Sequence, residues 1–268
     1  VQPPHLTDMH LIFFAGWLIT LQEFTSHSSI AAYINGVRQW ARHNDRPDPA
    51  IDATTNTTSF RYYRFMKSIK RKYSGKTIHR EPLSLLQLDL IINMITSGLV
   101  VDGINAINLK AAVLHAYFGM LRISEYTRNE VGGQVWGAKK ADINFIPDIN
   151  NPTSYEVTIP RSKTDNFRVG HTLRIYATGH NTICPVKAMQ ALFLCKQSNN
   201  NVSEPLFHFK KANASRQAFT TQLDRVLQAC SMPTAAIKPH SLRSGGASAY
   251  LQSGTDPYIV AKMGRWAS

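Results

Sequence analysis

The sequence predicts a mainly α-helical fold with a small β-sheet (α+β), divided into a helical N-terminal domain and a larger mixed α/β domain. Apolar residues recur at helical spacing through the first seventy-odd residues and again after about residue 84. From Val131 the pattern changes to short segments that alternate with a period of two, as strands do. Gly75 and Pro82 interrupt a basic connector, so we expect residues 1–76 and 77–268 to form separate domains.

The N-terminal domain is expected to contain three helices. The first covers Leu11–Phe24, whose apolar run is too short to span a bilayer. The second covers Ser28–His43, with Ser28 or Ser29 as its N-cap. The third covers Thr57–Tyr73 and should bury one apolar face. The residues of that face are Phe60, Tyr63, Met66, Ile69 and Tyr73.

The other face of the third helix is strongly basic, and the connector after it adds further cations. No acidic residue follows until Glu81, so no carboxylate three or four positions away neutralises this face. A basic helical face is often only solvated surface, but the missing neutralisation favours contact with a DNA backbone. The residues predicted to contact DNA are Arg61, Arg64, Lys67, Lys70, Arg71, Lys72 and Lys76.

In the larger domain, helices are expected before and after a small group of strands along the sequence. A strand near 143–145 precedes a β-hairpin with strands at 155–159 and 171–176 and a basic tip. A brief extended segment is expected at 206–209. The expected helices are 84–98, 103–120, a short one from about Ile123, 185–197, 215–230, 245–253 and one that Pro257 opens.

The charge balance indicates a polyanionic partner. The chain has 30 Lys and Arg against 17 Asp and Glu, a net charge of +13 and a pI near 9.8. Nucleic acid is the leading candidate, and an anionic membrane surface is the lesser one. The three cysteines form no CxxC pair and the ten histidines form no metal-ligand cluster. We therefore expect three buried free thiols in a reducing, intracellular compartment, and no metal centre.

Four short segments, far apart in the sequence, each offer a group suited to a phosphate. They carry Arg122 with Glu125, Lys163 on the expected hairpin tip, His240 with Arg243, and Gly264-Arg265-Trp266. Singly, each has an ordinary explanation: a structural salt bridge, a solvated lysine, a helix-capping histidine, or an aromatic ring packed on the core. His240 and Arg243 are three positions apart, so a helical turn directs both to the same side. Their joint order across a basic chain is what favours a functional site.

In this order, the segments AYFGMLRISEYT, IPRSKTD and HSLRSGGASAYLQSGTDPYIVAKMGRW resemble the active-site boxes of the tyrosine recombinase, or phage integrase, family. The helical N-terminal third resembles the SAM-like core-binding domain of that family, so the resemblance covers essentially the whole chain. It implies that residues 1–76 are a core-binding, DNA-binding domain and that residues 77–268 are a catalytic domain. The Gly-Arg-Trp ending is closest in style to members found in eukaryotic mobile elements.

The resemblance implies an arginine clamp for a phosphodiester. In-line attack builds negative charge on the non-bridging oxygens, and forked guanidinium groups stabilise that charge in a water-poor site. Arg122 and Arg243 would form this clamp. Glu125 would orient Arg122 without touching the phosphate itself.

The other implied roles complete a cleavage reaction that uses neither metal nor cofactor. His240 would bond a phosphate oxygen or assist deprotonation of the nucleophile, and Lys163 would protonate the leaving 5′ oxygen as general acid. Trp266 would donate its indole N–H to the same phosphate. In the family, a tyrosine forms a 3′-phosphotyrosyl link that stores the bond energy for religation.

The nucleophile is the missing group. The resemblance places this tyrosine beyond Ser268, so the catalytic domain would lack its C-terminal nucleophile segment within these residues. Tyr258 precedes the last box, and we expect it to pack the core with Ile259 and Met263 rather than to act as the nucleophile.

The predicted function is a site-specific DNA recombinase or integrase of a mobile element. One alternative is a DNA-binding remnant that does not cleave, and a less favoured one is a type IB topoisomerase, which shares the chemistry. The expected partners are double-stranded DNA and further copies of the chain, as a tetramer on paired sites, with no membrane and no small-molecule cofactor. The compartment would be the nucleus in a eukaryotic host and the cytoplasm otherwise.

Overall fold

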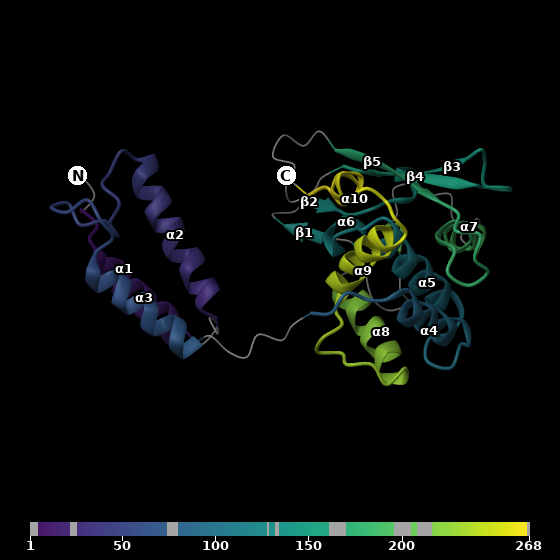
Figure 1. The fold of residues 1–268 in the computed structure, drawn as a ribbon, viewed down its shortest axis with the longest axis horizontal. Helices are drawn as coiled ribbons and strands as arrows, with labels where there is room; N and C mark the ends of the chain where they lie inside the picture. Colours follow the sequence, from purple (N-terminus) through teal and green to yellow (C-terminus); the bar gives the residue numbers. More distant parts are fainter. Residues whose placement is uncertain are drawn as a thin grey trace. The chain divides into compact units, whose positions relative to one another are not determined.

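The computed structural model describes residues 5–21, 26–73, 80–127, 129–131, 134–160, 170–195, 205–207 and 216–266. The chain forms two compact units, Val1–Thr77 and Ile78–Ser268 (Figure 1). Helices dominate both units, and the described sheet strands belong to the second one. The predicted α+β fold class is therefore confirmed.

The first unit is built from α1 (Asp8–Thr20), α2 (His27–His43) and α3 (Phe60–Tyr73). Their apolar faces meet in one small core, in which Leu11 and Ile34 are buried. All three helix starts differ from the prediction: α1 begins at Asp8 rather than Leu11, and polar side chains and turns set the starts of α2 and α3.

The N-cap of α2 is Ser26, whose Oγ accepts a hydrogen bond from the Ser29 N–H at 3.2 Å, so neither Ser28 nor Ser29 is the cap. The third helix begins at Phe60 rather than Thr57, because the Asp52 N–H donates to the Thr57 carbonyl at 2.8 Å and holds that segment in a turn.

The buried face of α3 also differs from the predicted one. Tyr62 and Ile69 are buried, whereas Phe60 and Tyr63 are exposed to 73% and 51%. The predicted face repeated every three residues, and on a helix of 3.6 residues per turn such a repeat rotates steadily around the axis. Phe60 and Ile69, nine positions apart, therefore lie on opposite sides. The exposed aromatic rings join the basic face.

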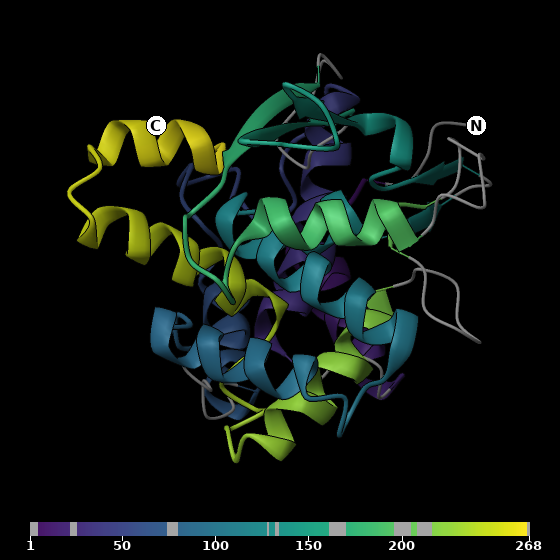
Figure 2. The same ribbon diagram turned by 90° about the vertical axis from the view of Figure 1, so that its right-hand side faces the viewer.

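In the second unit, further helices and a sheet surround a buried helix, α5. Its principal elements are α4 (Leu85–Thr96), α5 (Gly103–Phe118), α6 (Ile123–Tyr126), β1 (Asn129–Val131), β2 (Gln134–Trp136), β3 (Ile143–Ile146), β4 (Ser154–Ile159), β5 (His171–Tyr176), α7 (Pro185–Cys195), α8 (Arg216–Ala229), α9 (Pro239–Gln252) and α10 (Pro257–Gly264). Strands β3, β4 and β5 form an antiparallel sheet in that order, which confirms the predicted hairpin, and β1 pairs with β2. Helix α7 packs on α5 and beside β5 (Figure 2).

Two glycines bring α9 onto the centre of this unit. A Cβ atom at Gly246 would lie 2.0 Å from the Tyr117 carbonyl oxygen of α5, and one at Gly245 would lie 2.2 Å from the Leu83 carbonyl oxygen. No larger residue fits at either position without moving backbone. The helix was expected from Gly245, but Pro239 starts it, so the predicted pair His240 and Arg243 lies in its first turn.

The cysteines differ from the predicted set of buried thiols. Cys184 is buried, but Cys195 is exposed and Cys230 is partly buried, and all are free. Within the described ranges, no helix is long and apolar enough to cross a membrane. The described residues also contain no group of three or more His, Cys, Asp or Glu arranged to hold a metal ion.

Candidate functional site

Three segments that are distant in sequence converge at the candidate site. They are the turn from α5 into α6, the first turn of α9 and the end of α10, which lie together in the second unit (Figure 1). The carbonyl oxygen of Met120, in the α5–α6 turn, accepts hydrogen bonds from Arg243 Nη1 at 2.5 Å and from Arg265 Nη2 at 3.0 Å. One backbone oxygen thus connects all three segments.

Glu125 is the centre of the charged cluster. Its Oε1 accepts a hydrogen bond from Arg122 Nη1 at 3.1 Å, and its Oε2 accepts one from Arg265 Nη2 at 2.8 Å. The same Oε2 lies 4.0 Å from Arg243 Nη1. Glu125 is 3% exposed, so these are contacts in a largely water-free environment. Three guanidinium groups share one carboxylate, and the cluster keeps an excess of positive charge suited to an anion.

Arg243 is almost fully enclosed. Its residue is 1% exposed, and its Nη2 also donates to the Gly264 carbonyl. Burial, and after it the positive charges of Arg122 and Arg265, lower the pKa of Arg243 to about 10, while the charge of Glu125 opposes this shift. Its guanidinium therefore also holds α10 against the α5–α6 turn, in addition to the clamp role that the sequence implied.

His240 lies one helical turn before Arg243 and is exposed. Partial burial and the positive charges of Arg243, Arg80 and Arg122 lower the pKa of His240 below its ordinary value. A lowered pKa favours the neutral imidazole, which keeps one nitrogen free of a proton. A neutral imidazole beside guanidinium groups is suited to accept a proton from a hydroxyl nucleophile.

The Gly-Arg-Trp segment has a specific backbone shape. Arg265 adopts a left-handed conformation with φ of 55°, which ends α10 and turns its side chain toward Glu125. The Trp266 ring lies over the Arg243 guanidinium, 4.9 Å from ring centre to Cζ. A Cβ atom at Gly264 would lie 2.2 Å from this ring, so glycine is required for the stacking. Trp266 is 39% exposed, so part of the residue is accessible to a ligand.

Sequence reasoning assigned no role to Arg265, Arg80 or His171. Arg265 is buried and carries an Nε with no hydrogen-bond partner among the described residues. Burial, then the charge of Arg265, lowers the pKa of His171, and Glu125 opposes this, so the start of β5 lies near the cluster. The signal for Arg265 was its place between Gly264 and Trp266, but many arginines at helix ends are only solvated.

Lys163, the implied general acid, lies outside the described residues. The hairpin that carries it is described up to Pro160 at the end of β4 and again from Gly170. Because His171 at the base of that hairpin lies near the charged cluster, the hairpin starts from the same region of the unit.

Tyr258 was predicted to pack in the core, but it does not. It is 63% exposed, Ile259 is 50% exposed, and the Lys262 ammonium lies 4.6 Å from the centre of the Tyr258 ring. Val260 is the buried residue of this turn, with Met263 packed against it. Asp256 caps the helix through the Tyr258 N–H at 2.7 Å, and this sets the rotation that turns Tyr258 outward.

In the first unit, the predicted DNA-contacting residues of α3 are exposed. Three of their cations lie over rings: Arg64 over Phe60 at 5.7 Å, Lys67 over Tyr63 at 5.6 Å and Lys72 over Tyr73 at 5.6 Å. Arg61 differs from the expectation of an unneutralised face, because its Nε lies 3.4 Å from Asp8 of α1. Lys76 lies outside the described residues. The face presents alternating cations and aromatic rings.

Comparison with known proteins gives matches among solved structures only: no family model matches the chain, and neither does any curated protein. The Tn1549 transposon integrase in complex with transposon right end DNA matches with a TM-score of 0.58 and 11% identity, over 98% of this chain and 78% of that one. The lambda integrase (residues 75–356) bound to DNA matches with a TM-score of 0.51 and 14% identity, over the same shares.

The XerH site-specific recombinase bound to its difH substrate matches with a TM-score of 0.51 and 15% identity, over 81% of this chain and 62% of that one. In a second XerH complex, captured after cleavage, the match spans 48% of that chain. The chain therefore spans about half to three fifths of the XerH recombinase.

Proposed function

We propose that this chain, which has the tyrosine recombinase and integrase fold, binds duplex DNA and holds one phosphodiester for strand cleavage at Arg122, His240 and Arg243. The observation that carries the proposal is the convergence of three guanidinium groups on the single carboxylate of Glu125, beside His240, whose pKa their charges and partial burial lower. An excess of fixed positive charge in a buried setting is what a developing phosphorane-like charge requires.

The reaction proposed for this site breaks one P–O bond and forms another. A hydroxyl nucleophile attacks the phosphorus while His240 accepts or relays its proton, and the P–O5′ bond breaks. Lys163 protonates the departing 5′ oxygen, and Arg122 and Arg243 stabilise the non-bridging oxygens. Trp266 offers its indole N–H to the same phosphate. Because cationic side chains supply the charge stabilisation, the proposed chemistry uses no metal.

We propose that the exposed face of α3 contacts the phosphate backbone of the DNA. Its cations are the kind of group that neutralises DNA phosphates, and its rings Phe60 and Tyr63 add apolar contact area to the same surface. Such contacts fix the position of the protein on the duplex and do not read sequence. Assembly of several copies on paired DNA sites, as a tetramer, belongs to the same proposal.

The binding part is tested by fluorescence anisotropy with a labelled duplex over a range of salt concentrations. Arg122→Ala should weaken binding at least about ten-fold, because a charge-assisted hydrogen bond to phosphate contributes about 1.5–3 kcal/mol. Arg225→Ala on α8 removes an exposed arginine that contacts only Gln222 in the described part of the chain, at 3.5 Å, and is the matched control. Equal losses for the two variants would contradict a phosphate site at Arg122.

The nucleophile is tested by sequencing the gene past the codon for Ser268. We expect a tyrosine codon within about one helix length of Trp266. A covalent adduct with nicked DNA, seen on a denaturing gel, would then demonstrate cleavage by the complete product. A stop codon directly after Ser268 would instead favour a DNA-binding protein that does not cleave.

A further inference from the structure

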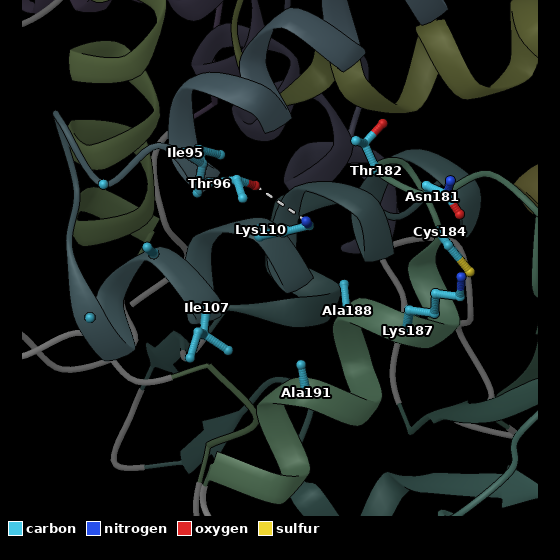
Figure 3. A pocket seen from close by; sticks show the side chains of 13 residues that line it. Ile95, Thr96, Ile107, Lys110, Asn181, Thr182, Cys184, Lys187, Ala188 and Ala191 are labelled. Carbon is cyan, nitrogen blue, oxygen red and sulfur yellow. Dashed lines mark hydrogen bonds between the residues drawn. The ribbon is translucent and has the colours of Figure 1, made fainter.

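A pocket of about 390 Å³ lies between α4, α5 and α7 (Figure 3), and no residue of the charged cluster lines it. Side chains of Ile95 and Ile107 form one apolar part of its wall, and Ala188 and Ala191 of α7 form another. The small alanine side chains leave the space open. A pocket of this size and apolar character is in the range that holds a small organic ligand.

Two lysines supply the charge of this pocket. Lys110 of α5 and Lys187 of α7 both line it, and its lining residues in the described ranges include no Asp or Glu. Figure 3 shows both side chains at the pocket, with Cys184 beside Lys187. A largely apolar chamber with cations at its wall and no carboxylate is complementary to an anion that carries an apolar body.

Among the residues that the structure describes, the Lys110 ammonium has only a neutral hydrogen-bond partner. Its Nζ donates to Thr96 Oγ1 at 3.2 Å, while the Thr96 hydroxyl donates its own hydrogen to the Ile92 carbonyl at 2.7 Å. An ammonium group has three donor hydrogens, and this hydrogen bond within the described residues uses one. Partial burial lowers the pKa of Lys110, as expected for a cation removed from water without a counter-charge. A partly buried charge is costly until an anion pairs with it.

We propose that this pocket binds a small amphiphilic carboxylate, with the carboxylate on Lys110 and an alkyl or aryl body against Ile95, Ile107 and Ala188. The body would displace water from the apolar wall, and the head group would complete the hydrogen bonding of the Lys110 ammonium. This site is independent of the DNA function proposed for the charged cluster.

The experiment is isothermal titration of the whole chain with decanoate, with decanamide as the neutral probe of the same length. We expect saturable binding of decanoate at one site and binding of decanamide at least about ten-fold weaker, the effect of losing a charge-assisted hydrogen bond. Lys110→Met should weaken decanoate to the same extent. Lys139→Met, at an exposed lysine that does not line the pocket, changes the net charge equally and should leave decanoate binding unchanged.

A second variant tests the location without changing charge. Ala191→Phe places a ring at the pocket and should reduce decanoate binding at least about ten-fold while keeping both lysines. Circular dichroism and the melting temperature establish that each variant is folded. Equal weakening by Lys110→Met and Lys139→Met, equal affinity for decanamide and decanoate, or full binding by a folded Ala191→Phe variant would each overturn the proposal.

Discussion

Replacing Glu125 by glutamine probes the charged cluster most severely, because this carboxylate is the shared counter-charge of Arg122, Arg265 and Arg243. Glu125→Gln keeps the shape and one oxygen acceptor but removes the negative charge. Breaking a buried ion pair by deleting one partner costs about 3–5 kcal/mol. Arg122 keeps 21% of its side chain exposed and is partly solvated, so we expect a loss of about 2–3 kcal/mol in the free energy of unfolding of the second unit.

The assay is thermal unfolding followed by circular dichroism. For a unit of this size, a loss of that magnitude lowers the melting temperature by about 5–10 °C. The matched control is Asp224→Asn, because Asp224 pairs with Lys238 at 3.3 Å with side chains 29% and 33% exposed, and a surface pair contributes at most about 1 kcal/mol. Inorganic phosphate should stabilise the Glu125→Gln variant more than the wild-type chain. If Glu125→Gln is no more destabilising than Asp224→Asn, the cluster is not organised by Glu125.

Three further predictions concern other parts of the chain. Gly246→Ala forces a Cβ atom against the Tyr117 carbonyl and should lower the free energy of unfolding by about 1–3 kcal/mol, measured by urea denaturation; an unchanged midpoint would show that α9 is not held so closely. Lys67→Ala should weaken DNA binding alike for unrelated sequences and reduce the slope of log affinity against log salt by about one, and a change confined to one sequence would contradict a backbone contact. Burial raises the pKa of Asp48, but hydrogen bonds from Arg38 and the Ala50 N–H outweigh this and lower it from 3.8 to about 2. Because the folded-state pKa of Asp48 is depressed, its ionised carboxylate stabilises the fold above about pH 4. This stabilisation, about 1–2 kcal/mol in total, is lost as the pH falls toward 2. Asp48→Asn should therefore flatten the acid limb of a pH–stability curve.

Most of the secondary structure could be predicted from the sequence, because capping residues and hydrophobic periodicity are local signals. Ser84 accepts a hydrogen bond from the Gln87 N–H at 3.2 Å and begins α4 where the prediction began its helix, and the period-two strands pair as the predicted hairpin. The face of α3 was wrong because a repeat of three residues was taken for one face of a helix. The predicted start of α9 was wrong: the helix was expected from Gly245, but Pro239 opens it six residues earlier.

The residue types of the candidate site could be predicted from the sequence, but the contacts between these residues could not. The order of the segments pointed to Arg122, His240 and Arg243, and the structure brings them together with Glu125. The position of Arg265 against Glu125 depends on a left-handed backbone conformation at a non-glycine residue, which no periodicity reveals. The two carbonyl contacts of Arg243 likewise depend on how three distant segments pack.

The same contacts change how an Arg243 variant is interpreted. Arg243→Ala removes a possible phosphate ligand and also leaves the Met120 and Gly264 carbonyls without their donor. Loss of DNA binding in that variant would therefore mix two causes. Arg243→Lys keeps a donor and a charge but not the fork, so it separates the two roles better: stability should fall less than in the alanine variant, while any strand cleavage should be lost.

The most direct test is an experimental structure of the chain bound to a duplex selected from a random library. The account predicts a backbone phosphate within hydrogen-bonding distance of Arg122, Arg243 and His240, with Glu125 still bonded to Arg122 and Arg265. A complex in which no phosphate approaches these side chains, and in which the DNA lies elsewhere on the second unit, would contradict the proposed site.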